Sequence, residues 1–132
     1  MLRVVDWFER VPLSPGELRL HPDLGTLAGR LAESTVGALL STIHGLDVAH
    51  LPESRDQGEV DFIINVGVHR IPIEVKYRAT IDPVRDVAAL QTFMSKSVNN
   101  APFALLVTQL DDVPALGPDV LPISLSSLML LR

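Results

Sequence analysis

Two strongly apolar segments separated by a glycine constrain the fold of this chain more than any other feature. Residues 59–66 and 68–78 are rich in Ile, Val, Phe and Tyr, which is typical of β-strands. Gly67 begins a two-residue connection of the kind that joins antiparallel strands. With Gly67 first in the turn, Val66 faces His69, and the rest of the register follows by counting. The sequence therefore predicts a β-hairpin in the middle of the chain.

The predicted register places two carboxylates opposite each other on strands that are otherwise apolar. Asp61 faces Glu74, and side-chain alternation puts Lys76 on the same face. Opposed Cβ atoms lie about 5 Å apart, where two like charges destabilise a sheet unless a cation lies between them. Oxygen ligands at this spacing suit Mg2+ or Mn2+. The alternative is a solvent-facing polar side of the hairpin, with Glu59 and Lys76 as a cross-strand ion pair.

Alternation divides the hairpin into two faces, with Arg78 and Glu59 expected on the carboxylate side. We expect the other face to be formed by Val60, Phe62, Ile64, Ile73, Val75 and Tyr77. Pro72 has no N–H to donate, so it must lie at a bulge or at a non-bonding position of the ladder.

The segments around the hairpin predict an α/β domain. Apolar spacing predicts a helix over 24–44, with Asp23 as a possible N-cap. Asp82 followed by Pro83 is a strong helix start, and this second helix should end near Ser97. Short strands are expected over 47–51, 103–109 and 121–124, the second of them buried on both faces. The order is helix, three strands, helix and strand, which predicts a mixed sheet flanked by helices.

Composition limits the classes of protein to which the chain can belong. Its 132 residues are the size of one domain, and 47% are apolar, enough for one core. We expect an irregular N-terminal arm over 1–23, because of its three prolines, and a single domain over 24–132. The net charge of −5 argues against nucleic-acid binding through bulk positive charge. The absence of cysteine fits the cytoplasm, and no apolar run is long enough to predict a membrane span.

Two further polar residues have unusual positions in the predicted helices. Gln91 occupies the centre of a helical stripe formed by Val84, Val87, Ala88, Met94 and Val98. It either points toward the sheet and the carboxylates or binds water at the open end of the domain. Glu33 lies opposite the main apolar stripe of the first helix, which on this pattern alone is a surface position. The four histidines have no metal-ligand spacing and are expected at the surface.

Together these residues resemble a known pattern. A helix glutamate (Glu33), a strand aspartate (Asp61) and the motif Glu74-Val75-Lys76 match the signature of the PD-(D/E)xK nuclease superfamily. The segments GEVDFII, IPIEVKYR, LAESTVGALL, APFALLVT and VLPISLSSL look like one branch of it. That branch is the nuclease-like C-terminal domain of unknown function of prokaryotic AAA-type ATPase chains. The resemblance covers about residues 20–130, and the ATPase portion of those chains is missing from this sequence.

The resemblance implies a restriction-endonuclease-like core and a metal-dependent phosphodiesterase acting on nucleic acid, with DNA favoured over RNA. Asp61, Glu74 and the carbonyl of Val75 would bind Mg2+ or Mn2+. Lys76 would assist attack by water on the phosphate, and Glu33 and Gln91 would support the site. We expect phosphate contacts from a basic strip formed by Arg55, Arg70, Arg78, Arg85 and Lys96.

Two other functions compatible with the sequence need no catalysis. In the first, the chain is an inactive module of nuclease fold that docks an ATPase domain or a partner protein, which its acidic charge and apolar composition favour. In the second, it is a dimerisation domain that forms a homodimer.

Overall fold

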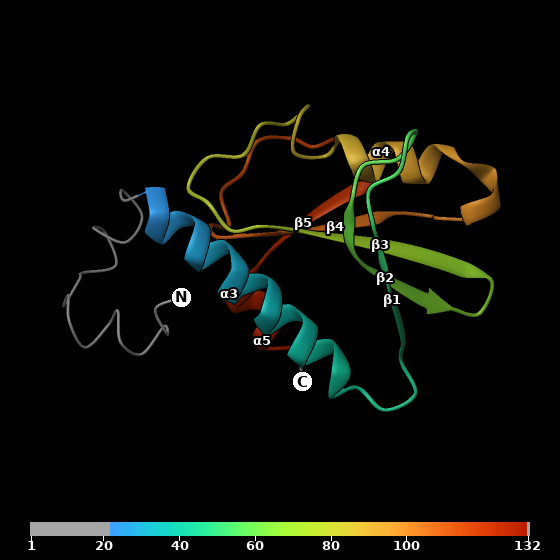
Figure 1. Ribbon diagram of the computed structural model, residues 1–132, viewed down its shortest axis with the longest axis horizontal. Coiled ribbons are helices and arrows are strands. Elements are labelled where there is room, and N and C mark those ends of the chain that lie inside the picture. Colours follow the sequence, from blue (N-terminus) through green and yellow to red (C-terminus); the bar gives the residue numbers. More distant parts are fainter. Residues whose placement is uncertain (1–21, 132) are drawn as a thin grey trace.

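A five-stranded mixed sheet lies between helices on its two faces in the computed structural model, which describes residues 22–131 (Figure 1). The elements are, in chain order, α3 (Pro22–Ser41), β1 (Asp47–Leu51), β2 (Val60–Val66), β3 (His69–Lys76), α4 (Ala88–Ser95), the 3-10 helix η1 (Ser97–Asn99), β4 (Ala104–Thr108), β5 (Val120–Ser124) and α5 (Leu125–Met129). The strand order is β1-β2-β3-β4-β5. The first three strands pair antiparallel, and β3, β4 and β5 pair parallel. The predicted α/β class and the predicted order of elements are confirmed.

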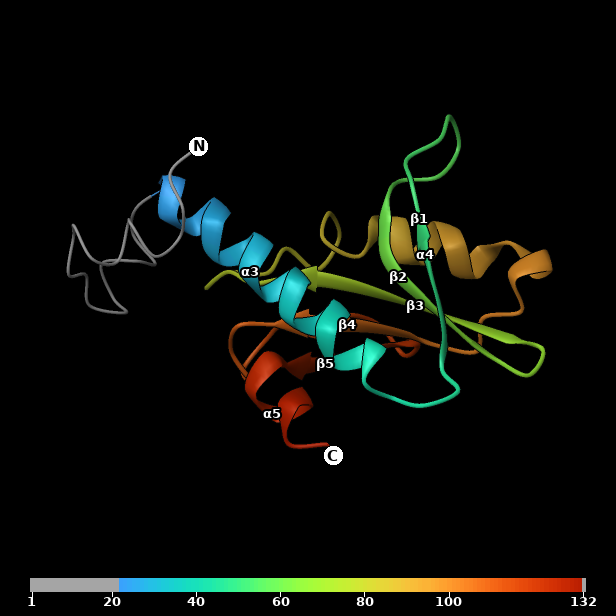
Figure 2. The same ribbon diagram turned by 60° about the horizontal axis from the view of Figure 1, so that its bottom comes forward.

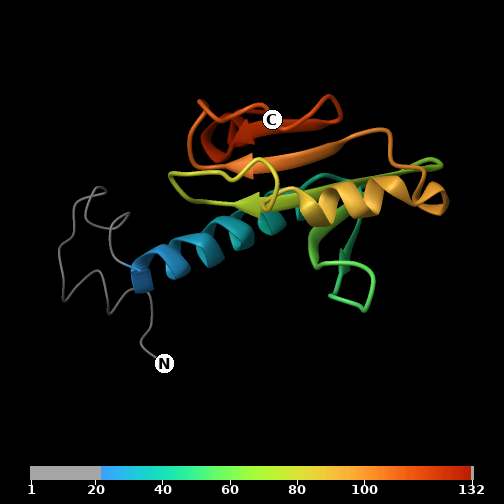
Figure 3. The same cartoon turned by 90° about the horizontal axis from the view of Figure 1, so that it is seen from above.

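The two faces of the sheet carry different helices. Figure 1 shows α4 above the strands and α3 below them, and in Figure 2 α5 lies beside α3. Figure 3 looks onto the α4 side, with α3 passing beneath the sheet. Strand β4 contributes Leu106 to the apolar cluster under α4 and Val107 to the cluster under α3 and α5. The predicted burial of this strand on both faces is therefore confirmed.

The hairpin has the predicted register. Val66 pairs with His69, and Gly67 has a φ of 60°, a conformation that glycine adopts without steric cost. Pro72 pairs with Ile63 and is fully buried. The N–H of Arg70 points away from β2, so alternation directs the nitrogen of Pro72 away from β2 as well. Because pairing of β3 with β4 begins only at Ile73, the proline interrupts no strand pair, as predicted for a non-bonding position.

Asn100 fastens the turn of the hairpin to the segment before β4. It is left-handed, with a φ of 46°. Its side-chain nitrogen donates to the carbonyl of Val68 at 2.8 Å, and its own carbonyl accepts from the N–H of Arg70 at 3.4 Å. The Nδ1 atom of His69 lies 3.3 Å from the same carbonyl. The turn is thus attached to a segment about 30 residues further along the chain.

A β-bulge interrupts the pairing of β1 with β2. Ala49 pairs with Ile63, but Leu51 pairs with Val60, so two residues of β2 stand opposite His50 alone. The extra residue reverses the alternation, and Val60 packs under α4 together with Ile63. The prediction that Val60 shares a face with Phe62 is therefore wrong, because Phe62 packs on the α3 side.

The second helix begins later than predicted. Residues 83–87 form turns, and α4 covers only Ala88–Ser95. Asp82 still caps this segment, because its Oδ1 accepts from the N–H groups of Val84 and Arg85 at 2.9 Å.

The predicted apolar stripe of the second helix is confirmed only in part, since Val87 is buried and Met94 packs against the core. Leu90 and Phe93 form the buried face of α4, whereas Val84 and Val98 are 77% and 84% exposed. Gln91 is exposed as well, so it does not point at the sheet. The turns before α4 break the helical spacing on which the prediction depended.

Two predictions concern the N-terminal part of the chain. Helix α3 begins at Pro22, so Asp23 is its second residue and not the residue before it. The predicted irregular arm otherwise lies outside the described residues. Within residues 22–131 no helix is long and apolar enough to cross a membrane.

Candidate functional site

A pocket of about 470 Å³ opens where α3, the ends of β2 and β3, and the start of α4 come together. Its lining comes from four parts of the chain and consists of Thr26, Gly29, Arg30, Glu33, Glu53, Glu59, Asp61, Glu74, Val75, Lys76, Arg85, Asp86 and Ala89. Four of the five predicted catalytic residues are therefore gathered here. Gln91 is the exception, since its Nε2 lies near Gly117 and outside this lining.

Asp61 and Glu74 are buried at the bottom of this pocket, at 8% and 7% exposure. The pairing of β2 with β3 stops at Phe62 and Ile73, one step before the two carboxylates would face each other. At that step the N–H of Val75 donates to Oδ2 of Asp61 at 2.8 Å. The side chain of Asp61 thus takes the place of a strand hydrogen bond, and the two strands separate at the pocket.

Glu74 has only half of its hydrogen-bonding capacity satisfied. Its Oε1 lies 3.0 Å from Nζ of Lys76, while its Oε2 is buried with no partner among the described residues. A buried carboxylate oxygen without a partner is costly. The alternative of a solvated hairpin face with a Glu59–Lys76 pair is therefore wrong, because Lys76 pairs with Glu74 and the face is covered.

The two buried carboxyl groups at the bottom of the pocket, Asp61 and Glu74, have raised pKa values. Burial, followed by the charge of Asp61, raises the pKa of Glu74 to about 7, against the opposing effect of Lys76. Burial also raises the pKa of Asp61, although the Val75 N–H and Lys76 favour its ionised form. In both cases burial outweighs the nearby positive charge of Lys76.

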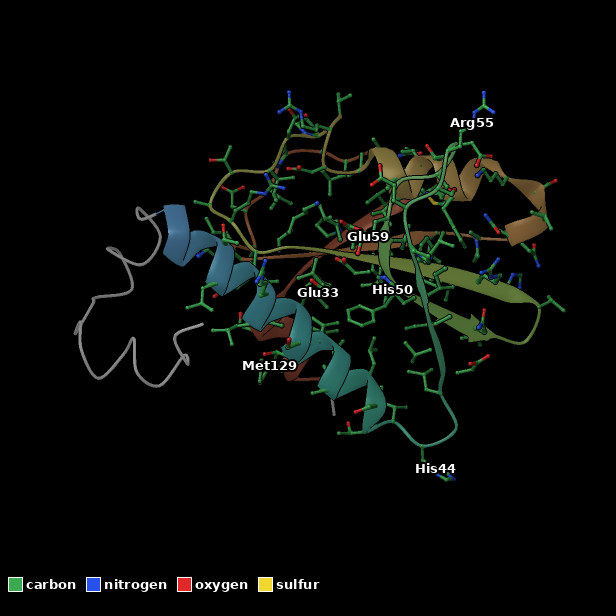
Figure 4. All side chains as sticks on the ribbon, viewed as in Figure 1. Glu33, His44, His50, Arg55, Glu59 and Met129 are labelled. Atoms are coloured by element: carbon green, nitrogen blue, oxygen red, sulfur yellow. The ribbon has the colours of Figure 1, made fainter. Side chains whose placement is uncertain are left out.

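Glu33 reaches this pocket from α3, on the opposite side from α4 (Figure 4). It is half-buried, and burial followed by the charges of Asp61 and Glu59 raises its pKa. The helix glutamate is thus brought close to the strand aspartate. Arg30, one turn earlier on α3, also lines the pocket. Arg30 was not predicted as a site residue, because its only signal in the sequence is its i−3 spacing from Glu33.

Charge and ligand type decide what this pocket can hold. Six carboxylates line it against three basic side chains. Across residues 22–131, no group of three or more His, Asp or Glu side chains could hold a metal ion. A hard cation would instead take its ligands from Asp61, Glu74, the carbonyl of Val75 and water. The unpartnered Oε2 of Glu74 fits such a ligand set.

The five predicted phosphate-binding residues do not form one strip. Of these five, Arg85 is the one that lines the pocket. Arg55 projects from the tip of the loop between β1 and β2, away from Glu33 (Figure 4). Arg70 lies at the other end of β3 from Glu74, since it pairs with Asn65.

Three of these basic residues have structural partners. Arg70 stacks over the ring of Phe93 at 5.1 Å and donates to Asn99 at 2.8 Å. Arg78 pairs with the buried Asp86 at 3.0 Å, and Lys96 pairs with Asp56 at 3.3 Å. The prediction failed because their positions in the sequence carry no information about which acidic residues the fold places beside them.

The structure also assigns positions to two polar residues that our sequence analysis did not place at the site. Gln57 is buried, and its Nε2 donates to the carbonyl of Ala89 at 2.9 Å, which attaches the loop before β2 to α4. His50, expected at the surface without a role, has its Nδ1 2.9 Å from the carbonyl oxygen of Asp61. Nothing in the sequence signalled either contact, because each depends on the loop between β1 and β2.

Comparison with known proteins gives one family. A family model matches residues 28–126, which are 99 of the 132 residues. Its description is "Domain of unknown function (DUF4143)". No curated protein matches the sequence.

Proposed function

The chain belongs to the DUF4143 family, whose description gives no activity, and we propose from the geometry of the pocket that it is a divalent-cation-dependent phosphodiesterase acting on nucleic acid. The observation that carries the proposal is the buried pair Asp61 and Glu74, with an unpartnered Oε2 on Glu74 and Lys76 beside it. The resemblance to the PD-(D/E)xK nucleases supports the reaction type.

Different residues of the pocket would bind the cation and the phosphate. Asp61 and Glu74 would hold Mg2+ or Mn2+ together with the carbonyl of Val75. The hydrogen bond from the Val75 N–H to Oδ2 fixes the carboxylate of Asp61. Glu33 adds negative charge from the side of α3. When bound, the cation would neutralise charge on the phosphate and lower the pKa of a water molecule.

Lys76 is the residue proposed to contact the phosphate. Its ammonium lies 3.0 Å from Glu74, and its side chain is 29% exposed, so it can reach the pocket opening. Arg30 and Arg85 are exposed on either side of the same pocket. With the acidic groups neutralised by a cation, these three side chains provide the positive charge that a phosphodiester needs.

Thermal unfolding with and without cations tests the binding step. Mg2+ or Mn2+ at tenfold its Kd should stabilise the folded protein by roughly 1.4 kcal/mol and so raise the Tm. Asp61→Asn should remove this increase. Glu53→Gln, which removes a charge at the exposed rim of the pocket, is the matched control and should retain most of it. Equal Tm increases in wild type and Asp61→Asn would place the cation elsewhere.

Cleavage tests the reaction. The protein should cut nucleic acid at low salt with Mn2+, and single-stranded, duplex and branched DNA and RNA should be compared. Lys76→Ala should lose cleavage. Because this change removes the ion-pair partner of the buried Glu74, circular dichroism first checks that the variant is folded at the assay temperature. If no substrate is cut, or if Lys76→Ala cuts as fast as wild type, the catalytic proposal fails.

A second candidate function is a docking module without catalysis, and a different surface favours it. Leu31 and Ile43 on α3 are 39% and 47% exposed, and Met129 at the end of α5 is 43% exposed. Two apolar grooves run along α3 toward α5 in the same region. An ATPase domain or another partner protein could cover this face. Failure of both cation binding and cleavage would favour this function.

A further inference from the structure

We propose that His50 is a positioning residue for Asp61, because its imidazole binds the carbonyl oxygen of Asp61 where a β-bulge interrupts the pairing of β1 with β2. The proposed role deepens the proposed function, since it concerns a residue of the same cation site. The contact itself, however, belongs to the fold, and it can be tested whether or not the protein binds a cation.

The bulge places Asp61 where ordinary strand pairing fails. His50 stands alone opposite Asp61 and Phe62, between the regular pairs formed by Ala49 and Leu51. A bulge leaves one residue without its ladder partner, and such features frequently redirect a side chain next to a functional site. The carbonyl oxygen of Asp61 lies at this interruption, and a backbone carbonyl in the interior of a protein needs a hydrogen-bond partner.

The side chain of His50 supplies that partner. Its Nδ1 lies 2.9 Å from the carbonyl oxygen of Asp61. A carbonyl can only accept, so Nδ1 must carry the proton and donate. The other ring nitrogen, Nε2, then faces Oε1 of Glu59 at 3.6 Å, a longer contact between two half-exposed groups. The short contact to Asp61 is therefore the one that we expect to matter.

Two hydrogen bonds hold Asp61 from opposite sides. On the side of β1, the imidazole of His50 holds its carbonyl; on the side of β3, the N–H of Val75 holds its carboxylate. With the first bond removed, the bulge can rotate and the carboxylate can leave the position that it shares with Glu74. Groups that orient a metal ligand from behind typically change metal affinity by about 10–100-fold when they are removed.

Three substitutions at one position separate the two contacts of His50. In His50→Asn the amide nitrogen is bonded to Cγ, as Nδ1 is, so it can still donate to Asp61. In His50→Gln the amide nitrogen takes the place of Nε2 and can reach only Glu59. His50→Ala removes both contacts. Glu59→Gln is a matched control, since it weakens the Nε2 contact and leaves the bond to Asp61 intact.

Two measurements are made on each variant at one fixed pH. The first is the affinity for Mn2+, which should fall about tenfold in His50→Ala and His50→Gln and remain near wild type in His50→Asn. Glu59→Gln removes a charge from the pocket lining, so this variant is judged by the second measurement. The second is the amide proton resonance of Val75 without any cation, because this proton is bonded to Asp61. The chemical shift of this proton should change in His50→Ala and His50→Gln and remain unchanged in His50→Asn and Glu59→Gln.

The outcomes separate this proposal from the proposed function. If wild type does not bind Mn2+ but the Val75 resonance follows the expected pattern, the cation site fails and the positioning role of His50 is supported. If His50→Asn behaves like His50→Ala in both measurements, or if all four variants leave the Val75 resonance unchanged, the positioning role is overturned. If His50→Gln and not His50→Asn behaves like wild type, the contact to Glu59 is the important one, and the proposal is overturned as well.

Discussion

Glu74 is a buried glutamate that shares a pocket with a second carboxylate, and its only ionic partner within residues 22–131 is Lys76. Burial and Asp61 raise its pKa from 4.5 to about 7. The folded protein therefore binds a proton in a pH range where the unfolded chain has released it. Ionisation of Glu74 must consequently destabilise the fold, unless a cation is bound beside it.

The free energy of unfolding should therefore depend on pH in the range where Glu74 ionises. As the pH rises from about 4.5 to about 7, the folded state binds more protons than the unfolded state, so the free energy of unfolding falls. The loss from Glu74 alone is of the order of 2–3 kcal/mol. Glu74→Gln should remove most of this loss and be more stable relative to wild type at pH 8 than at pH 5. Urea unfolding at several pH values measures the difference.

The control for this experiment is Glu53→Gln, which removes one carboxylate at the exposed rim of the same pocket. It should follow the wild-type curve. A wild-type curve that is flat between pH 4.5 and 7 would contradict the burial of an ionisable Glu74.

Single residues differed in how far the sequence could predict them. Asp61, Glu74 and Lys76 were predictable because hairpin register and alternation are local rules. Gln91 was not, because its direction depended on where a helix begins. His50 and Arg30 lie at the site through tertiary contacts, and no local rule singles them out.

At the scale of elements, the bulge in β2 explains why the hairpin faces were predicted only in part. The alternation of side chains held from Phe62 onward and failed at Val60, because the bulge inserts one residue between the regular pairs. The existence and order of the strands were predictable from apolar runs. The bulge was not, since no glycine or proline marks it in β2.

Helix α3 packs closely against the sheet at Gly37, and this contact leads to a prediction. A Cβ atom at Gly37 would lie 3.2 Å from the ring of Phe62, whereas one at Gly29 on the same helix would meet nothing within 4 Å. Gly29→Ala should therefore gain about 0.5–1 kcal/mol from helix propensity alone. Gly37→Ala should gain less, and Gly37→Leu should lose roughly 1–3 kcal/mol through overpacking.

Chemical denaturation of the three variants measures these differences. Gly29→Leu serves as the control for side-chain size on the same helix. If Gly37→Leu is as stable as Gly29→Leu, the close packing of α3 on Phe62 is contradicted.

At the scale of the whole molecule, the net negative charge should weaken the binding of nucleic acid. The net charge is −5, and three basic side chains line the pocket. Binding of duplex DNA through three phosphate contacts should give a plot of log K against log salt with a slope of about −3. Titration at several salt concentrations, with Mn2+ held constant, measures this slope. A slope near −8 would show that most contacts come from outside the pocket.

The attachment of Asn100 to the hairpin turn has a consequence for the order of folding. The hairpin β2–β3 is local in sequence, whereas the bond from Asn100 to Val68 forms only when α4 has crossed over and β4 has paired in parallel with β3. We expect this exposed polar contact to form after the rate-limiting step, which would give Asn100 a φ-value near 0. Asn100→Ala should therefore speed unfolding and leave the folding rate nearly unchanged. The lifetime of the folded chain, more than its rate of formation, depends on this one side chain.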